Sequence, residues 1–127
     1  MAKRVVIVDD AATLARQLKL FFEEVMGYEV VAIGADGIQA VDLYRSHRPD
    51  LITLDITMPL KDGEAALKEI LAEFPDARIM MISAIRGPEI TKCLMAGALA
   101  YMEKPLLFKD PRFVKDFKAS LEEVFAK

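Results

Sequence analysis

Residues 4–10 read Arg4-Val5-Val6-Ile7-Val8-Asp9-Asp10, a short run of mostly β-branched residues that ends abruptly in two carboxylates. The run lacks the alternation of polar and apolar residues that is typical of a half-exposed strand. Strands that are buried on both faces have such continuous apolar patterns, and they are typical of parallel sheets covered by helices. We therefore predict a buried parallel strand over residues 4–8, with the acidic pair directly beyond its carboxyl end.

Further apolar runs of the same kind follow at regular intervals along the chain. They cover residues 28–33, 51–54, 78–82 and 99–102. Between the runs, apolar residues recur at helical spacing. Regular alternation of strand and helix predicts right-handed crossovers and a parallel sheet with helices on both faces. Because the chain has 127 residues and no linker-like stretch, we expect one doubly wound α/β domain over residues 1–127.

The helical stretches have recognisable ends and buried stripes. The first is expected to end at Gly27, and the second to begin at the N-cap residue Asp36. The last two are expected to begin at Pro88 and Pro111, since proline is tolerated in a first helical turn. The stripes predicted for the first two helices are Leu14, Leu18, Phe22 and Val25, and then Ile38, Val41 and Tyr44.

Composition narrows the class of protein. With 54% hydrophobic and 29% charged residues, the chain has enough apolar surface to form a core. A net charge of −3 argues against direct nucleic-acid binding. Cys93 is the only cysteine, which excludes an intrachain disulfide and a thiolate metal cluster. No apolar leader or span of membrane length is evident, so we expect no membrane insertion and a cytoplasmic location.

Polar residues follow four of the five predicted strands. They are Asp9 and Asp10 after the first strand, Asp55 after the third, Ser83 after the fourth and Lys104 after the fifth. In open parallel sheets the functional crevice lies at the carboxyl ends of the strands. We therefore expect three carboxylates, a hydroxyl and an ammonium to converge at one edge of the sheet.

These residue types suit phosphoryl transfer to a carboxylate. Neighbouring carboxylates repel unless a cation lies between them, and Mg²⁺ prefers one or two carboxylates together with water and phosphate oxygens. A carboxylate can act as the nucleophile on phosphorus, while a metal ion and an ammonium neutralise the charge of the transferring group. Asp55 is the predicted phosphoryl acceptor, with Lys104 and Ser83 as groups that hold the phosphoryl oxygens.

The order of these motifs resembles the receiver domains of bacterial two-component response regulators. The resemblance rests on Val8-Asp9-Asp10, Asp55, Met58-Pro59, Asp62-Gly63, Ser83-Ala84 and Lys104-Pro105, and it spans nearly the whole chain. In length the chain is most similar to stand-alone, CheY-like regulators. The resemblance implies a flavodoxin-like, CheY-like sheet with strand order 2-1-3-4-5 and five helices.

The resemblance also implies how the acceptor would be phosphorylated. Asp55 would accept the phosphoryl group from the phosphohistidine of a sensor histidine kinase or of a phosphotransfer protein. Asp10 would bind Mg²⁺ directly, Asp9 would bind it through water, and the backbone carbonyl of Thr57 would be a further ligand. Lys104 would pair with Asp55 before transfer and with the phosphoryl group afterwards.

The resemblance also implies how phosphorylation would change the surface of the protein. Ser83 and Tyr101 would respond to the phosphoryl group and change the surface formed by the fourth helix, the fifth strand and the fifth helix, where a downstream partner binds. Pro105 is expected to follow a cis peptide bond. The chemistry would be directed only at the chain itself, as phosphoryl transfer to Asp55 and slow hydrolysis.

Simpler interpretations stay open at this point. Asp9, Asp10, Asp55 and Ser83 are residue types that cap helices and turns, and Lys104 by itself is an ordinary surface residue. One rival function is an aspartyl-phosphate phosphatase acting on an external substrate. Haloacid-dehalogenase-like enzymes of that kind usually carry a second aspartate where this chain has Thr57. A flavodoxin-like cofactor binder and a degenerate receiver used only for docking are the other rivals.

Overall fold

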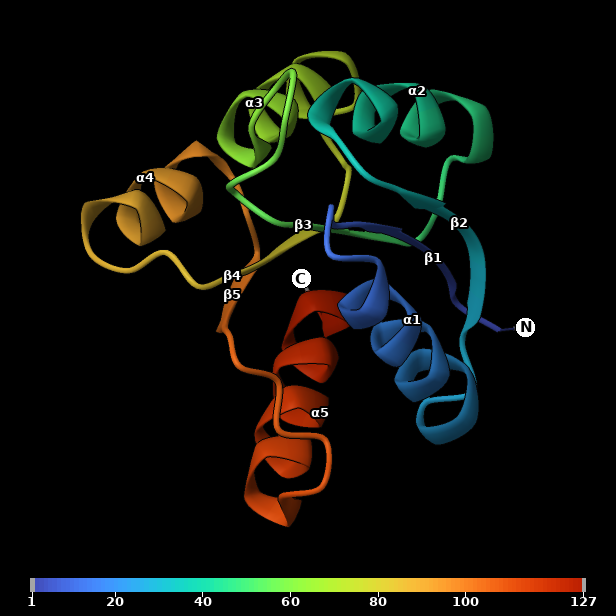
Figure 1. The fold of residues 1–127 in the computed structure, drawn as a ribbon. Coiled ribbons are helices and arrows are strands. Elements are labelled where there is room, and N and C mark those ends of the chain that lie inside the picture. The colour runs from blue at the N-terminus through green and yellow to red at the C-terminus, as the bar shows by residue number, and fades with distance from the viewer. Residues whose placement is uncertain (1, 127) are drawn as a thin grey trace.

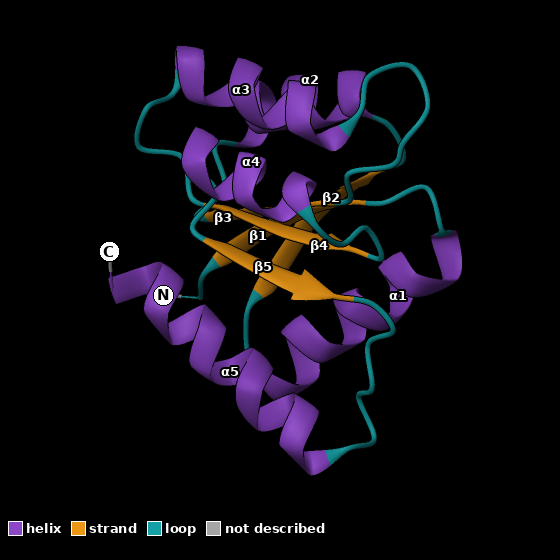
Figure 2. Ribbon diagram, turned by 90° about the vertical axis from the view of Figure 1, so that its left-hand side faces the viewer, coloured by secondary structure: helices purple, strands orange, loops and turns teal. Residues whose placement is uncertain are grey.

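The computed structural model describes residues 2–126 as a twisted, five-stranded parallel sheet with helices packed on both faces (Figures 1 and 2). The strand order is β2-β1-β3-β4-β5, as predicted. The strands are β1 Arg4–Val8, β2 Glu29–Gly34, β3 Leu51–Leu54, β4 Ile79–Ser83 and β5 Ala100–Glu103. The helices are α1 Ala12–Leu20, which continues as the π-helix η1 Phe21–Val25, then α2 Gly37–His47, α3 Gly63–Glu73, α4 Pro88–Ala96 and α5 Pro111–Ala126.

The central strands are buried on both faces because their side chains alternate between two hydrophobic clusters. Val6 and Val8 of β1 point to the face covered by α2, α3 and α4. Val5 and Ile7 point to the opposite face, where α1 and α5 pack. Figure 2 shows these two helical layers with the sheet between them. This double burial explains why the strands read as continuous apolar runs.

Several helix ends follow the sequence signals. The Asp36 carboxylate accepts a hydrogen bond from the backbone N–H of Gln39 at 2.8 Å, which makes it the N-cap of α2. Pro88 and Pro111 are the first residues of α4 and α5. The starts of these three helices fix where the chain turns away from the edge of the sheet that carries the polar residues.

Two predicted stripe positions are wrong. Val25 is 50% exposed because the last turn before Gly27 is a π-helix, in which the backbone N–H of Met26 bonds to the carbonyl of Phe21. This wider turn rotates the residues that follow away from the α-helical stripe. Ile38 is 46% exposed, since α2 faces the sheet through Gly37, Ala40, Val41 and Tyr44.

None of the described helices could span a membrane. Every helix between residues 2 and 126 is too short or too polar to cross a bilayer.

Candidate functional site

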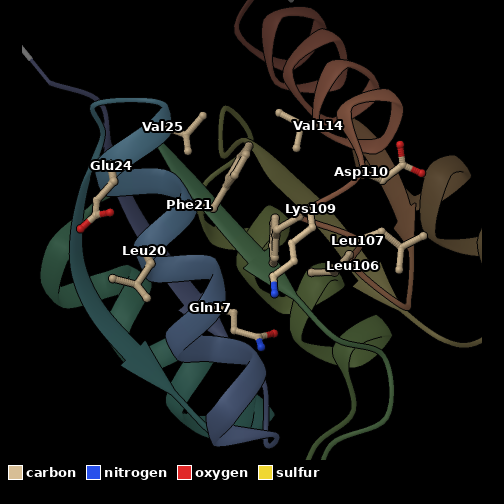
Figure 3. Close-up of a pocket in the computed structure, with 11 residues that line it drawn as sticks. Gln17, Leu20, Phe21, Glu24, Val25, Leu106, Leu107, Lys109, Asp110 and Val114 are labelled. Atoms are coloured by element: carbon tan, nitrogen blue, oxygen red, sulfur yellow. The ribbon is translucent and has the colours of Figure 1, made fainter.

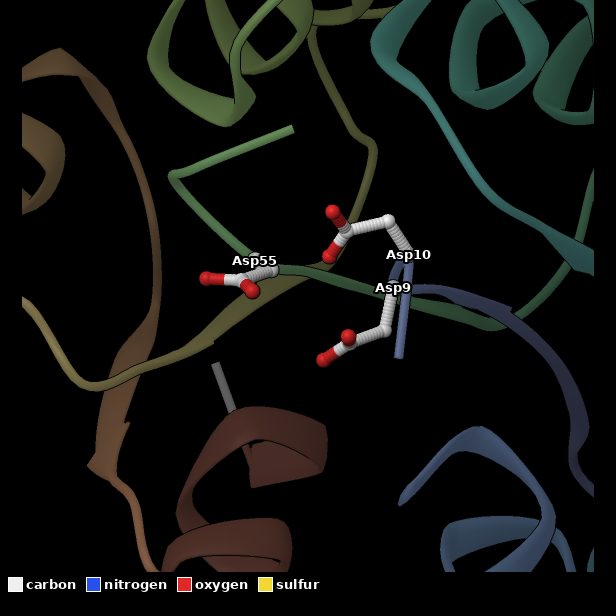
Figure 4. Close-up of side chains that lie close together, drawn as sticks. All are labelled: Asp9, Asp10 and Asp55. Atoms are coloured by element: carbon white, nitrogen blue, oxygen red, sulfur yellow. The ribbon is translucent and has the colours of Figure 1, made fainter. Parts of the chain in front are cut away.

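Three carboxylates meet at the carboxyl ends of β1 and β3. The two strands are hydrogen-bonded neighbours, with Val8 paired to Leu54, so the residues that follow them emerge side by side. Asp9, Asp10 and Asp55 each present a carboxylate oxygen, and these oxygens lie within 4.8 Å of one another (Figure 4). Asp9 and Asp55 are buried, at 3% and 6% exposure, while Asp10 is exposed.

Lys104 brings an ammonium into this cluster from the end of β5. Its Nζ lies 2.8 Å from Asp9 Oδ2 and 2.9 Å from Asp55 Oδ2. Burial alone would lower the pKa of Lys104, but hydrogen bonds and charge attraction from Asp9 and Asp55 outweigh it, so the pKa is raised. The contact with Asp55 was expected, whereas the contact with Asp9 was not. The contact with Asp9 could have been predicted, because β1 and β3, the strands that Asp9 and Asp55 follow, are neighbours in the sheet.

The simpler interpretation of Asp55 as a loop cap is wrong. The N-cap of α3 is Asp62, whose carboxylate accepts a hydrogen bond from the backbone N–H of Ala65 at 2.8 Å. The hydrogen bond found for the Asp55 side chain within residues 2–126 comes from Lys104. Its other oxygen, Oδ1, has no hydrogen-bond partner in that part of the chain. The Asp55 carboxylate is therefore held by its ion pair with Lys104, and it does not cap the start of α3.

Asp9 differs from Asp10 in how far its oxygens are already engaged. Asp9 Oδ1 accepts a hydrogen bond from the backbone N–H of Ala11 at 2.9 Å, and its Oδ2 contacts Lys104. Asp10 makes no ion pair or side-chain hydrogen bond within the described residues. The exposed carboxylate of Asp10 is thus the freer of the two ligand groups.

The donor set fits a hard divalent cation. Three carboxylates and one ammonium give the cluster a formal charge of −2, which one divalent ion would balance. The ligands are all oxygens, the atom type that Mg²⁺ prefers in proteins. Thr57 lies two residues beyond Asp55 with an exposed side chain, in the irregular segment between β3 and α3.

Ser83 and Tyr101 are joined through a third residue, Ile85. Ser83 is 1% exposed, and its hydroxyl accepts a hydrogen bond from the backbone N–H of Ile85 at 3.3 Å. The Tyr101 hydroxyl donates to the carbonyl of Ile85 at 2.5 Å. Burial raises the pKa of Tyr101, and the nearby Ser83 hydroxyl offsets part of that effect. The turn after β4 therefore links the two predicted readout residues, a role for Ile85 that sequence reasoning missed.

The segment after β5 also follows expectation. The peptide bond between Lys104 and Pro105 is cis. The backbone N–H of Lys104 bonds to the carbonyl of Ser83 at 3.0 Å, which fixes the start of this segment to the end of β4. The polar side chains predicted for the site thus lie at the carboxyl ends of their strands, whereas Tyr101 lies within β5.

Known proteins share this sequence pattern and this fold. The sequence model described as "Response regulator receiver domain" matches residues 5–115. The chemotaxis protein CheY of Bacillus subtilis is 45% identical over 106 residues, which are 83% of this chain and 88% of that protein. CheY of Thermotoga maritima is 40% identical over 116 residues, covering 91% and 94% of the two chains.

A solved structure agrees in backbone. It is the CheX-CheY-BeF3-Mg complex of Borrelia burgdorferi, matched with a TM-score of 0.88 and 34% identity over 98% of this chain and 90% of that one. The likeness extends across all the elements that form the site.

Proposed function

Since the chain belongs to the family of response regulator receiver domains, we propose that Asp55 is the carboxylate that accepts its phosphoryl group. Receiver domains of this kind are phosphorylation-activated signalling switches of two-component systems. The observation that carries the proposal is the placement of Asp55: buried, beside two further carboxylates and in contact with the ammonium of Lys104. The proposed donor is the phosphohistidine of a sensor histidine kinase or of a phosphotransfer protein.

In the proposed reaction, Asp55 Oδ1 attacks phosphorus. A new O–P bond forms, the P–N bond to the donor imidazole breaks, and the imidazole leaves with the bonding electrons and takes up a proton. Oδ1 is the better nucleophile because Oδ2 is engaged by Lys104. Lys104 then pairs with the phosphoryl oxygens, and hydrolysis of the acyl phosphate by water returns Asp55 to its starting state. The chain thus acts on itself, without an external substrate.

The metal proposed for this site is Mg²⁺. Asp10 and Asp55 would hold it directly, Asp9 would hold it through water because its oxygens are already engaged, and the backbone carbonyl of Thr57 would complete the protein ligands. When bound, the ion neutralises charge on the phosphoryl oxygens.

The proposed readout runs through Ser83, Ile85 and Tyr101. A phosphoryl group on Asp55 adds strong acceptor oxygens, which attract the Ser83 hydroxyl. Movement of Ser83 shifts the turn at Ile85 and changes the hydrogen bond that holds Tyr101. The surface of α4, β5 and α5 is thereby altered, and a downstream protein that prefers one conformer gains affinity.

Intact-mass spectrometry tests the acceptor. The protein is incubated with Mg²⁺ and a small-molecule phosphodonor, and wild type should gain one phosphoryl group. Asp55→Asn should gain none, whereas Asp42→Asn, which changes an exposed aspartate of α2, should behave as wild type. A chelator should abolish the gain. Equal phosphorylation of Asp55→Asn would refute the assignment, and multiple turnovers on an external phosphate ester would favour the phosphatase.

A further inference from the structure

A buried hydroxyl in β3 stands outside the contacts of the site. Thr53 is 1% exposed, and its Oγ1 has no hydrogen-bond partner within residues 2–126. Arg78 Nε is the other buried side-chain nitrogen or oxygen of the described residues without such a partner, but its guanidinium lies over the ring of Phe125 at 5.5 Å. Burying an unpaired hydroxyl costs free energy that valine, which has the same shape, would not cost. Packing therefore does not explain why this residue is a threonine.

Thr53 points to the face of the sheet on which α1 and α5 pack. Its neighbours in the adjacent strands are Ile7 of β1 and Met80 of β4, and both belong to the hydrophobic cluster on that face. Ile52 and Leu54, on either side of Thr53 in β3, belong to the opposite cluster. The hydroxyl therefore lies in an apolar layer of the core.

The open hollow on this side of the sheet does not reach the hydroxyl. It has a volume of about 730 Å³ and lies between α1 with η1 and residues 106–110 with α5 (Figure 3). Phe21 lines it and belongs to the same hydrophobic cluster as Ile7 and Met80, whereas Thr53 is not among its lining residues. The hydroxyl therefore depends on the protein for a partner.

Asp9 lies diagonally across from Thr53 in the neighbouring strand. Ile7 pairs with Thr53, and Asp9 follows Ile7 by two residues, so its side chain is on the same face. The pairing of β1 with β3 continues to this level, since the backbone N–H of Asp55 bonds to the carbonyl of Val8 at 3.2 Å. Diagonal neighbours in a sheet lie roughly 7–8 Å apart, and less between Cβ atoms. Rotation about the χ1 of Thr53 can therefore bring its hydroxyl toward the Asp9 carboxylate.

The Asp9 carboxylate needs another donor if Lys104 moves. Figure 4 shows it directed to the side of the sheet where α1 and α5 lie. Its Oδ1 accepts a hydrogen bond from Ala11, its Oδ2 contacts Lys104, and only 2% of the side chain is exposed. In the proposed reaction Lys104 pairs with the phosphoryl oxygens, which weakens its hold on Asp9 Oδ2. A buried carboxylate oxygen without a donor is costly, so a replacement for Lys104 would be favoured.

On the basis of the proposed function, we propose that Thr53 is a positioning residue for Asp9. When Lys104 moves to the phosphoryl group, the Thr53 hydroxyl donates a hydrogen bond to Asp9 Oδ2 in its place. Asp9 thereby keeps the orientation that its role beside the metal requires. The hydroxyl touches neither the phosphoryl group nor the metal, and it acts only through Asp9.

The rate of phosphoryl incorporation is the first test. Wild type, Thr53→Val and Thr53→Ser are incubated with Mg²⁺ and acetyl phosphate, and the gain in intact mass is followed over time. Thr53→Val lacks the donor, so incorporation should slow by about two- to tenfold, the effect of one hydrogen bond. Thr53→Ser keeps the hydroxyl and should restore most of the rate. The control Ile52→Val removes a methyl group that faces the opposite cluster, and it should leave the rate unchanged.

A double-mutant cycle in urea unfolding tests the same hydrogen bond without phosphoryl transfer. Lys104→Met removes the present partner of Asp9 Oδ2, so the Thr53 hydroxyl should become its donor in that background. Thr53→Val should leave the unfolding midpoint of the otherwise wild-type chain unchanged or raise it, and should lower the midpoint of Lys104→Met. A hydroxyl with a packing role alone would give the same change in both backgrounds.

Three results would overturn the proposal. They are equal incorporation rates in wild type and folded Thr53→Val, no recovery of the rate in Thr53→Ser, and the same midpoint change in both backgrounds. Circular dichroism melts establish that each variant is folded. If wild type gains no phosphoryl group, the proposed function fails by itself, and the unfolding cycle then decides whether the Thr53 hydroxyl serves Asp9.

Discussion

Asp55, Asp9 and Asp10 are chemically identical side chains whose surroundings make them different. Asp55 has one oxygen paired with Lys104 and one without a hydrogen bond in the described chain, Asp9 has both oxygens engaged, and Asp10 is exposed. A nucleophile needs a free oxygen, and a direct metal ligand needs an accessible one. The proposed roles of acceptor, water-mediated ligand and direct ligand follow from these contacts.

Lys104 is predicted to act as an internal counter-ion for the metal site. Replacing it in Lys104→Met changes the formal charge of the cluster from −2 to −3 and leaves two buried carboxylates without their partner. Without metal, we expect a loss of about 2 kcal/mol in the free energy of unfolding. Mg²⁺ should raise the melting temperature of the variant more than that of wild type.

The control for this prediction is Lys68→Met, which removes an exposed ion pair with Glu64. Such surface pairs contribute roughly 0–1 kcal/mol, and the response to Mg²⁺ should not change. Equal Mg²⁺ responses in wild type and Lys104→Met would contradict the counter-ion role.

Leu60 is predicted to be strained. It has a φ of +69°, in the left-handed region that disfavours residues with a Cβ, and its side chain is 79% exposed. Asparagine tolerates this conformation better, so Leu60→Asn should raise the free energy of unfolding by about 1 kcal/mol. Leu107→Asn, at 50% exposure and without a positive φ, should bring no such gain in chemical denaturation. A stability loss in Leu60→Asn would show that the leucine side chain has a stabilising contact.

At the scale of elements, the position where α3 begins controls the position of Asp55. A Cβ added to Gly63, the first residue of α3, would lie 2.0 Å from the backbone carbonyl oxygen of Asp55. Gly63→Ala should therefore cost about 1–3 kcal/mol of stability and displace the acceptor, which would reduce phosphoryl incorporation.

Gly27→Ala is the comparison for this prediction. It meets no atom within 4 Å and suffers only from its φ of +70°. We expect a loss of about 1 kcal/mol and unchanged phosphorylation. Intact-mass measurement of both variants distinguishes the two effects, and normal phosphorylation of a folded Gly63→Ala would contradict the proposed steric role.

The elements also show where sequence reasoning reaches its limit. Continuous apolar runs indicated the buried strands, and the residue after each run indicated the site, because parallel strands bring their carboxyl ends to one edge. The π-helix after Leu20 left no such local signal in the sequence; within it, Phe21 and Phe22 contact the ring of Phe117 of α5. The contact of Lys104 with Asp9 follows from the adjacency of β1 and β3, whereas the bridging role of Ile85 depends on the shape of the turn after β4, which residue order alone does not give.

At the scale of the whole molecule, stability is expected to fall in alkaline solution. Burial raises the pKa of Cys93, Tyr28, Tyr44 and Tyr101, and the aspartate contacts raise that of Lys104. As pH rises, the unfolded chain loses these protons first, so the folded state binds more protons and is progressively disfavoured. The decline should begin above about pH 8.5 for the thiol and steepen above about pH 10 for the phenols and the ammonium.

Urea unfolding across this pH range measures the decline. Tyr44→Phe removes one phenol with a raised pKa and should make the decline above about pH 10 shallower. An unfolding free energy that stays constant or rises from about pH 8.5 to 11 would contradict the expected direction.

The central claim is that the phosphoryl group is carried by Asp55, and locating that group tests the claim most directly. Borohydride reduces an acyl phosphate to an alcohol, so a phosphorylated aspartate becomes homoserine and is identified by tandem mass spectrometry after proteolysis. We expect conversion at Asp55, dependent on both phosphodonor and Mg²⁺, with Asp9 and Asp10 unchanged. Conversion of Asp9 or Asp10 with Asp55 intact would contradict the account.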